Sequence, residues 1–228
     1  MKRLVFLLVC LAAFTLPQHL YAQLLVNGGF ETPVLSPGTF LTITPGNEPT
    51  GFGWTVLSGS VDVGYTPILP FVAYPAYQGN QALDLNGVNR GAVFQNFATV
   101  IGQTYTVSFA YADNPDELGS VKSASVVVTN VANSDILISD NIFHSTSTNS
   151  PPNADFFLFG DTFIATGTNT RLTLTSTSAS NSASGGLFID AVSVAVAVPE
   201  PSSIMLISSL GLAAAGYWWK KKRGIKLA

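Results

Sequence analysis

The chain has 228 residues, of which 47% are hydrophobic and only 10% are charged, against about 25% charged in a typical globular protein. Its net charge is −3, and between the two termini the basic residues are Arg90, Lys122 and Arg171. So sparse a set excludes the clustered basic face of a nucleic-acid-binding protein. The single cysteine, Cys10, lies near the N-terminus, so the rest of the chain can form neither a disulfide nor a thiolate metal site.

Residues 1–22 have the three parts of a secretory signal peptide. Lys2 and Arg3 form a positive start, residues 4–16 form an apolar run, and Ala22 ends the segment with a small side chain. We therefore predict cleavage by signal peptidase after Ala22. The alternative is a retained anchor, but about 13 apolar residues are short for a span that needs about 20. Cys10 is interpreted as part of the apolar run, because Val9 before it is larger than a lipidation site requires.

Residues 23–197 are predicted to form one extracellular domain, an all-β antiparallel sandwich. Short runs rich in β-branched and aromatic residues alternate with turn signals such as Asn86-Gly87 and Gly185-Gly186. Residues 104–111 alternate cleanly, and no amphipathic helix pattern precedes residue 200. The predicted strands are residues 24–26, 53–56, 61–63, 82–85, 92–97, 104–111, 124–129, 136–138, 155–165, 171–175 and 187–196. This series is typical of a sandwich.

Residues 198–228 form a tail of three segments. The motif at residues 198–202 contains Pro199, which cannot continue a strand. Residues 202–219 are mostly apolar and long enough, as a helix, to cross a membrane. Residues 220–228 begin with a basic cluster, which the positive-inside rule keeps in the cytoplasm, with the domain outside. Physical arguments alone thus predict a single-span protein, with a plain membrane anchor as the simplest interpretation.

The order of these parts resembles the PEP-CTERM sorting signal of bacterial proteins. The matching residues are Val198, Pro199, Glu200 and Pro201, followed by the span and the basic end. The resemblance implies recognition by exosortase, a membrane enzyme that removes the tail near the motif. The membrane helix would then be a temporary anchor, and the domain would be released or joined to envelope material.

The domain itself is similar to the choice-of-anchor C domain of bacterial surface proteins. The resemblance rests on residues 25–33, 78–87, 102–109 and 186–194, in that order. That domain is similar to plant cell-wall modules and to galactose-binding-like carbohydrate modules, which implies a β jelly roll. The family's usual aspartate pair is reduced here to Asp190-Ala191.

No catalytic motif is present in the sequence, and we predict that the protein is not an enzyme. His144 is the one histidine beyond the leader and lies in a run of serines and threonines, where we expect a solvated loop. A glycoside hydrolase needs two carboxylates that face one bond. The acids are spread along the chain, but sequence alone leaves a matrix-glycan-acting enzyme open as the alternative.

Two binding sites are predicted from residue chemistry and the resemblance. Glu31 after the first strand and Asp190 in the last would approach in a jelly roll, and the resemblance implies a structural calcium there; the alternative is that both carboxylates accept backbone amides. Sugar binding uses exposed aromatic and polar side chains. The candidates for sugar binding are Trp54, Tyr74, Tyr77, Asp84 and Asn86, with Arg90 beside them. Trp54 is also a candidate core residue.

The sequence therefore predicts an exported structural or adhesive protein of the envelope or exopolysaccharide. Its expected partners are signal peptidase, exosortase and extracellular polysaccharide, with the inner membrane as a transient anchor and no nucleic acid. Ice binding is disfavoured, because Thr173, Thr175 and Thr177 form only a short regular run of threonines.

Overall fold

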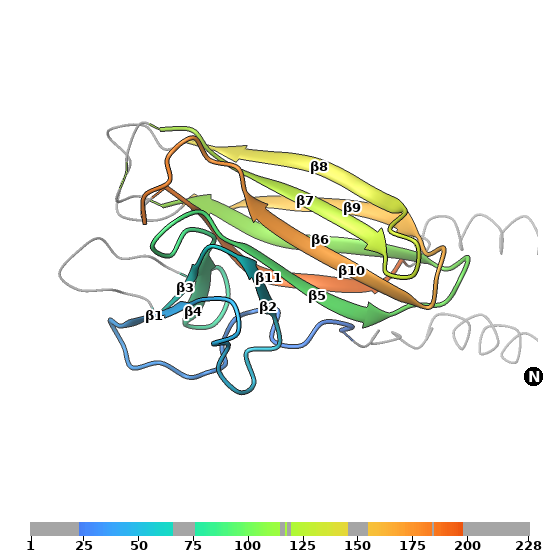
Figure 1. The fold of residues 1–228 in the computed structure, drawn as a ribbon, viewed down its shortest axis with the longest axis horizontal. Coiled ribbons are helices and arrows are strands. Elements are labelled where there is room, and N and C mark those ends of the chain that lie inside the picture. Colours follow the sequence, from blue (N-terminus) through green and yellow to red (C-terminus); the bar gives the residue numbers. More distant parts are fainter. Residues whose placement is uncertain are drawn as a thin grey trace, which may run out of the picture. The chain divides into compact units, whose positions relative to one another are not determined.

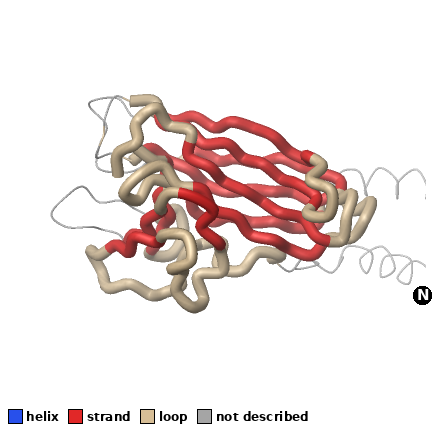
Figure 2. The backbone as a smooth tube through the Cα atoms, in the orientation of Figure 1, coloured by secondary structure: helices blue, strands red, loops and turns tan. Residues whose placement is uncertain are grey.

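The computed structural model describes residues 23–65, 76–114, 117, 120–145, 155–183 and 185–197. In this part of the chain eleven strands form two antiparallel sheets that pack face to face (Figure 1). Figure 2 shows strands and loops, and no helix, among these residues. The all-β sandwich predicted from the sequence is confirmed.

Sheet A contains six strands and sheet B contains five. In spatial order, sheet A is β1 (Phe40–Ile43), β3 (Val61–Tyr65), β4 (Gln81–Asp84), β11 (Leu187–Val196), β6 (Thr104–Asp113) and β9 (Phe157–Ile164). Sheet B is β2 (Thr55–Ser58), β5 (Ala92–Ala98), β10 (Asn169–Ser176), β7 (Lys122–Asn130) and β8 (Ile136–His144). Strands far apart in sequence are therefore neighbours, and the last strand lies in the middle of sheet A.

The core lies between the inner faces of the two sheets. On β6 the alternation places Val107 and Phe109 inside, and on β10 it places Leu172 and Leu174 inside, all buried. Burial of each such side chain contributes roughly 1.5–3 kcal/mol. This packing holds together a domain that has no cysteine.

The first predicted strand, residues 24–26, is not a strand of either sheet, and β1 was not predicted. Val26 donates its N–H to Gln95 Oε1 at 2.6 Å and accepts from Gln95 Nε2 at 2.9 Å. A side-chain amide thus takes the place of a neighbouring strand. The other predicted strands are present: β11 has the predicted bounds, the others have shifted ends, and β8 extends from the predicted Ile138 to His144.

β11 carries a bulge between Asp190 and Ser193, where its register against β6 shifts. Ala191, inside the bulge, has a φ of 53°, in the left-handed region that a residue with a Cβ seldom adopts. A bulge of this kind redirects side chains and is common beside functional sites. Here it lies directly under the groove described next.

Candidate functional site

A groove of about 650 Å³ lies on the outer face of sheet A. Its lining includes Gln23, Tyr77, Gln78, Ser108, Leu158 and Ser193. Ser108 and Ser193 are register partners on β6 and β11 and alternate with the buried Val107 and Val194, so they face away from the core. None of the described residues that line the groove has a charged side chain.

The residues that precede the sandwich form one wall of this groove. Gln23 Nε2 donates to Val192 O at 2.6 Å, and Ser193 Oγ donates to Gln23 Oε1 at 2.7 Å. The backbone N–H of Leu24 also donates to Val194 O at 3.1 Å. Three hydrogen bonds therefore fix this segment along the bulged strand.

Tyr77 is the aromatic side chain that borders the groove and is exposed, with 44% of its surface accessible. Its ring centroid lies 5.6 Å from that of Phe156 in a tilted arrangement. Such a contact limits the positions of the ring while leaving part of it open to a ligand. Tyr77 is therefore an exposed ring at the border of the groove, and its role in sugar binding stays a prediction.

Two carboxylates hold the loop that carries Tyr77. Asp190 Oδ2 accepts the N–H of Gln78 at 2.8 Å, and Glu31 Oε1 accepts those of Asn80 at 2.7 Å and Gln81 at 2.9 Å. Gly79 stands between these donors with a φ of 68°, and a Cβ on it would lie 2.2 Å from Glu31 Oε1. The turn at Gly79-Asn80 is therefore held by hydrogen bonds to the two acids.

The electrostatics of Asp190 are set by burial. Desolvation raises the pKa of Asp190 to about 6, although the N–H groups of Gln78, Ala191 and Tyr77 lower it, and the nearby charge of Glu31 raises it further. The side chain is fully buried. Backbone amides alone therefore compensate for only part of the cost of burying this charge.

Glu31 and Asp190 do approach each other, as expected for the predicted calcium site. Both have an atom within 4 Å of the position that a Cβ on Gly29 would occupy. Their oxygens already accept backbone N–H groups, and in the described ranges no cluster of three or more acidic, histidine or cysteine side chains surrounds them. This donor set fits a pair of amide-bound carboxylates better than a calcium ion, which takes six to eight oxygens.

Trp54 lies in the core and not at a binding surface. It is 2% exposed, its ring lies 5.6 Å from that of Phe30, and its Nε1 donates to Asn27 O at 3.2 Å. The core alternative for this residue is therefore the one that the structure favours. Tyr74 and the sorting residues Val198, Pro199, Glu200 and Pro201 lie outside the described residues.

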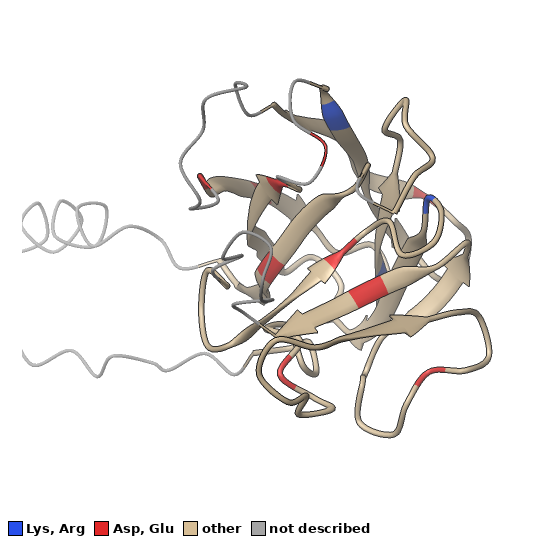
Figure 3. Ribbon diagram, turned by 90° about the vertical axis from the view of Figure 1, so that its left-hand side faces the viewer, with Lys and Arg blue, Asp and Glu red and all other residues tan. Residues whose placement is uncertain are grey.

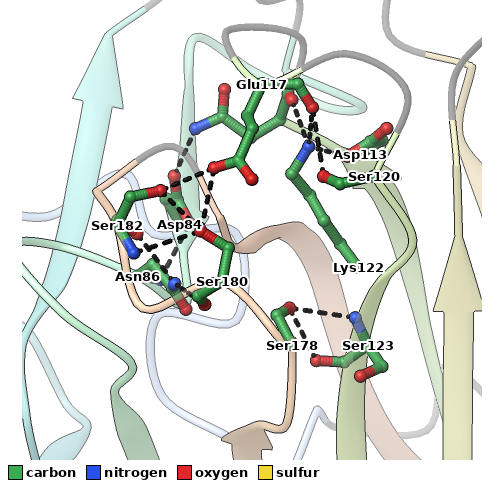
Figure 4. Close-up of polar contacts among 11 residues, drawn as sticks. Asp84, Asn86, Asp113, Glu117, Ser120, Lys122, Ser123, Ser178, Ser180 and Ser182 are labelled. Atoms are coloured by element: carbon green, nitrogen blue, oxygen red, sulfur yellow. Dashed lines mark hydrogen bonds and ion pairs between the residues drawn. The ribbon is translucent and has the colours of Figure 1, made fainter.

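Asp84 and Asn86, proposed from the sequence as sugar ligands, are buried. Asp84 accepts the N–H of Asn86 at 2.8 Å and the side-chain amide of Asn114 at 2.7 Å, and burial raises the pKa of Asp84 well above its usual range. Asn86 Nδ2 donates to Ser182 O at 2.9 Å. Both side chains are directed into a polar cluster and not toward solvent, so their role in sugar binding is corrected to a structural one (Figure 4).

The same cluster contains a fully buried ion pair. Lys122 Nζ lies 2.5 Å from Asp113 Oδ1, and both side chains have no exposed surface. Nζ also donates to Asn114 O at 2.8 Å and to Glu117 O at 2.5 Å. Figure 4 shows the Lys122 side chain reaching this group from β7. The pair therefore fastens the chain segment after β6 to the neighbouring sheet.

His144 is not in a solvated loop, as the sequence suggested. It is the last residue of β8 and is 5% exposed, with its ring centroid 4.5 Å from that of Phe157. Its Cα partner across the ladder is Lys122. The polar residues that follow His144 resemble a loop, so the sequence pattern did not indicate that β8 continues to His144.

Sequence reasoning missed Gln23, Gln78 and Ser193. Their common feature is a neutral polar side chain, which no motif marks. The one available signal was position in the sequence. Gln23 directly precedes the predicted strand at residues 24–26, and Gln78 begins the segment 78–87 that carries the resemblance. Ser193 lies three residues after Asp190 in the last predicted strand. Charged residues elsewhere are few and scattered (Figure 3).

Comparison with known proteins gives two family matches. The family described as "Protein of unknown function (DUF642)" matches residues 23–195, and the PEP-CTERM protein-sorting motif matches residues 197–222. None of the curated proteins matches the chain. Among the residues that the structure describes, no helix is long and apolar enough to cross a membrane.

Several solved structures are similar to part of this chain. The structure of TmCBM61 in complex with beta-1,4-galactotriose is 17% identical and covers 77% of this chain and 99% of its own, with a TM-score of 0.46. The CBM22-1 xylan-binding domain from Paenibacillus barcinonensis Xyn10C is 16% identical and covers 71% of this chain and 97% of its own, with a TM-score of 0.44.

Proposed function

Because the chain belongs to the DUF642 family and carries a PEP-CTERM sorting motif, we propose that it is an exported envelope protein that binds extracellular polysaccharide through the groove on sheet A. The motif implies export and transient anchoring in the membrane. Signal peptidase would remove residues 1–22, and exosortase would act near Pro199. The mature domain would then serve a structural or adhesive role in the envelope or exopolysaccharide.

One observation carries the binding proposal: the groove combines an exposed aromatic ring with neutral hydrogen-bonding groups. Tyr77 offers a face on which a sugar ring can stack, while Gln78, Ser108 and Ser193 offer amide and hydroxyl groups. Binding sites for small uncharged ligands commonly combine apolar surface with a few placed polar groups. The lack of charge in the lining favours a neutral glycan segment.

The arrangement of the acids favours binding over hydrolysis. A hydrolase needs two carboxylates facing an open cleft. Asp62 and Asp84 are ladder partners, but Asp84 is buried and bonded to Asn86 and Asn114. Glu31 and Asp190 bond to the loop that they support. Asp84, Glu31 and Asp190 therefore use carboxylate oxygens for hydrogen bonds within the fold.

Affinity electrophoresis of the full chain in detergent against neutral polysaccharides tests the groove. Tyr77→Ala is expected to weaken retardation about tenfold, because it removes the stacking surface. Phe143→Ala is the matched control, since Phe143 is an exposed ring on the other sheet, with 58% of its surface accessible. Equal retardation of wild type and Tyr77→Ala by every retarding glycan would remove the groove from the proposal.

Mass spectrometry of the protein from its native host tests the sorting proposal. We expect an N-terminus at Gln23 and a C-terminus near Pro199–Pro201, with or without an attached group. A protein that keeps residues 202–228 in its mature form would instead be a permanently anchored one.

A further inference from the structure

The outer face of sheet B differs from the groove in composition. Strand alternation turns its outward side chains away from the buried Val93, Leu172 and Val126. The outward residues include Thr55, Phe94, Asn96, Arg171, Thr173, Thr175, Ser125, Val127, Thr129, Ser139, Asn141 and the exposed Phe143. Among the described strands of this face, Arg171 is the one charged side chain that alternates outward.

The guanidinium of Arg171 is held in place by two contacts. Its Cζ lies 3.9 Å from the centroid of the Phe94 ring, and its Nε donates to Asn96 Oδ1 at 2.8 Å. Arg171 stands mid-sheet, with Asn96 and Thr129 as its ladder partners. Stacking and the Nε bond fix the plane of the group, so less conformational freedom is lost when a ligand binds.

The terminal nitrogens of Arg171 make no hydrogen bond to the described residues. The other lysine and arginine side chains among these residues, Arg90 and Lys122, do bond to neighbouring groups. Arg90 donates to Ser178 O and to Asn181 Oδ1. Lys122 is buried against Asp113. Glu48 accepts the N–H of Val56, on the edge strand β2, at 2.9 Å, and Asp140 on the other edge strand is the ladder partner of the buried Val126. Arg171 is therefore a cation on an open face with two parallel N–H donors to spare.

We propose that this face binds an acidic polysaccharide, with a uronate carboxylate paired to the Arg171 guanidinium. A planar guanidinium matches a carboxylate through two parallel hydrogen bonds. The surrounding threonine, serine and asparagine side chains supply partners for sugar hydroxyls. The proposal rests on the proposed function only in taking a polysaccharide as the partner. Because the groove lies on the outer face of the opposite sheet, one domain would bridge two glycan chains.

Alginate and its propylene glycol ester are suitable probes, because the ester keeps the backbone and blocks the carboxylates. Binding of the full chain in detergent is measured by microscale thermophoresis at low and high salt. Arg171→Gln is expected to weaken alginate binding about tenfold, and Arg171→Lys severalfold, since lysine keeps the charge but loses the planar pair. Arg90→Gln, the matched control with the same change of charge, is expected to bind like wild type.

The salt and ester arms test the chemistry of recognition. Wild type should bind alginate more weakly as salt rises and should bind the ester at least tenfold more weakly than alginate. Tyr77→Ala should bind alginate like wild type, which separates this face from the groove. The proposal is overturned if wild type does not bind alginate, if Arg171→Gln binds it undiminished, or if the ester binds equally well.

Discussion

Asp113 and Asp190 are both fully buried carboxylates, but different groups compensate for their burial. Asp113 lies against the Lys122 ammonium, which also donates to two backbone carbonyls. Asp190 has only backbone amides as its donors and another carboxylate, Glu31, as its charged neighbour. The first site is an ion pair within the sandwich; the second supports a loop at the groove.

This difference predicts opposite effects of removing charge. Taking away one member of the Lys122–Asp113 pair leaves an uncompensated charge in the interior and destabilises the fold. Neutralising Asp190 relieves a cost of desolvation, as its raised pKa shows. Asp113, paired with Lys122, therefore contributes to the stability of the fold. Asp190 lowers that stability, but its hydrogen bonds hold the loop that carries Tyr77.

The largest effect is expected for Lys122→Met, which breaks the ion pair. We expect a loss of about 3–5 kcal/mol in the free energy of unfolding, because the buried Asp113 carboxylate loses the Lys122 ammonium beside it. Urea unfolding followed by tryptophan fluorescence measures this, since Trp54 reports on the core.

The double variant Lys122→Met with Asp113→Leu serves as the control for this prediction. It should recover much of the lost stability, because both charges are then absent. If Lys122→Met lowered the free energy of unfolding by less than about 1 kcal/mol, the ion pair would contribute little to the stability of the sandwich.

The next largest effect concerns pH. The pKa of Asp190 is about 6 in the fold, against 3.8 as its ordinary value, so the folded state binds more protons between these values. Stability from this group is therefore fully present below pH 3.8 and is lost as pH rises through 6, by roughly 2–3 kcal/mol. Urea unfolding of wild type and Asp190→Asn between pH 4 and 7 isolates this contribution.

Asp190→Asn should show a flatter dependence on pH than wild type, whatever its own stability. Asp135→Asn, at an exposed turn, is the matched control and should keep the wild-type slope. Parallel curves for wild type and Asp190→Asn would show that burial of this carboxylate does not govern the dependence.

A smaller effect is expected at the loop that Glu31 and Asp190 support. Gly79→Ala places a Cβ against Glu31 Oε1 at a positive φ, whereas Gly46→Ala, also at a positive φ, meets nothing within 4 Å. We expect about 1 kcal/mol of destabilisation for Gly46→Ala and about 1–2 kcal/mol more for Gly79→Ala. Only Gly79→Ala should also weaken glycan binding, because it displaces Tyr77. Equal losses of stability in the two variants would show that the contact between Gly79 and Glu31 does not stabilise this loop.

The strands could largely be predicted from sequence because alternation and turn residues are local signals. β6 and β10 show them well, while β1 is four residues long and pairs only with β3. The predicted strand at residues 24–26 failed because Gln95, a distant side chain, supplies its partner. His144 was misplaced because the polar residues after it resemble a loop.

The groove could be predicted only in part. Tyr77 was proposed for its chemistry, and Glu31 and Asp190 were brought together by the expected pairing of the chain ends. Burial of Asp84 and Asn86 depends on contacts with Asn114 and Ser182, which no local pattern reveals. The shift of register in β11 that exposes Ser193 likewise depends on its neighbour β6.

The smallest effect is expected for calcium, the ion predicted from sequence at Glu31 and Asp190. Backbone N–H groups of Tyr77, Gln78, Asn80, Gln81 and Ala191 already donate to these carboxylates. A bound cation would have to displace them, so melting curves with saturating calcium and with chelator should coincide within about 1 °C. A calcium-dependent rise that Glu31→Gln abolishes would instead establish the ion, and the amides would then be partners of the carboxylates only in its absence.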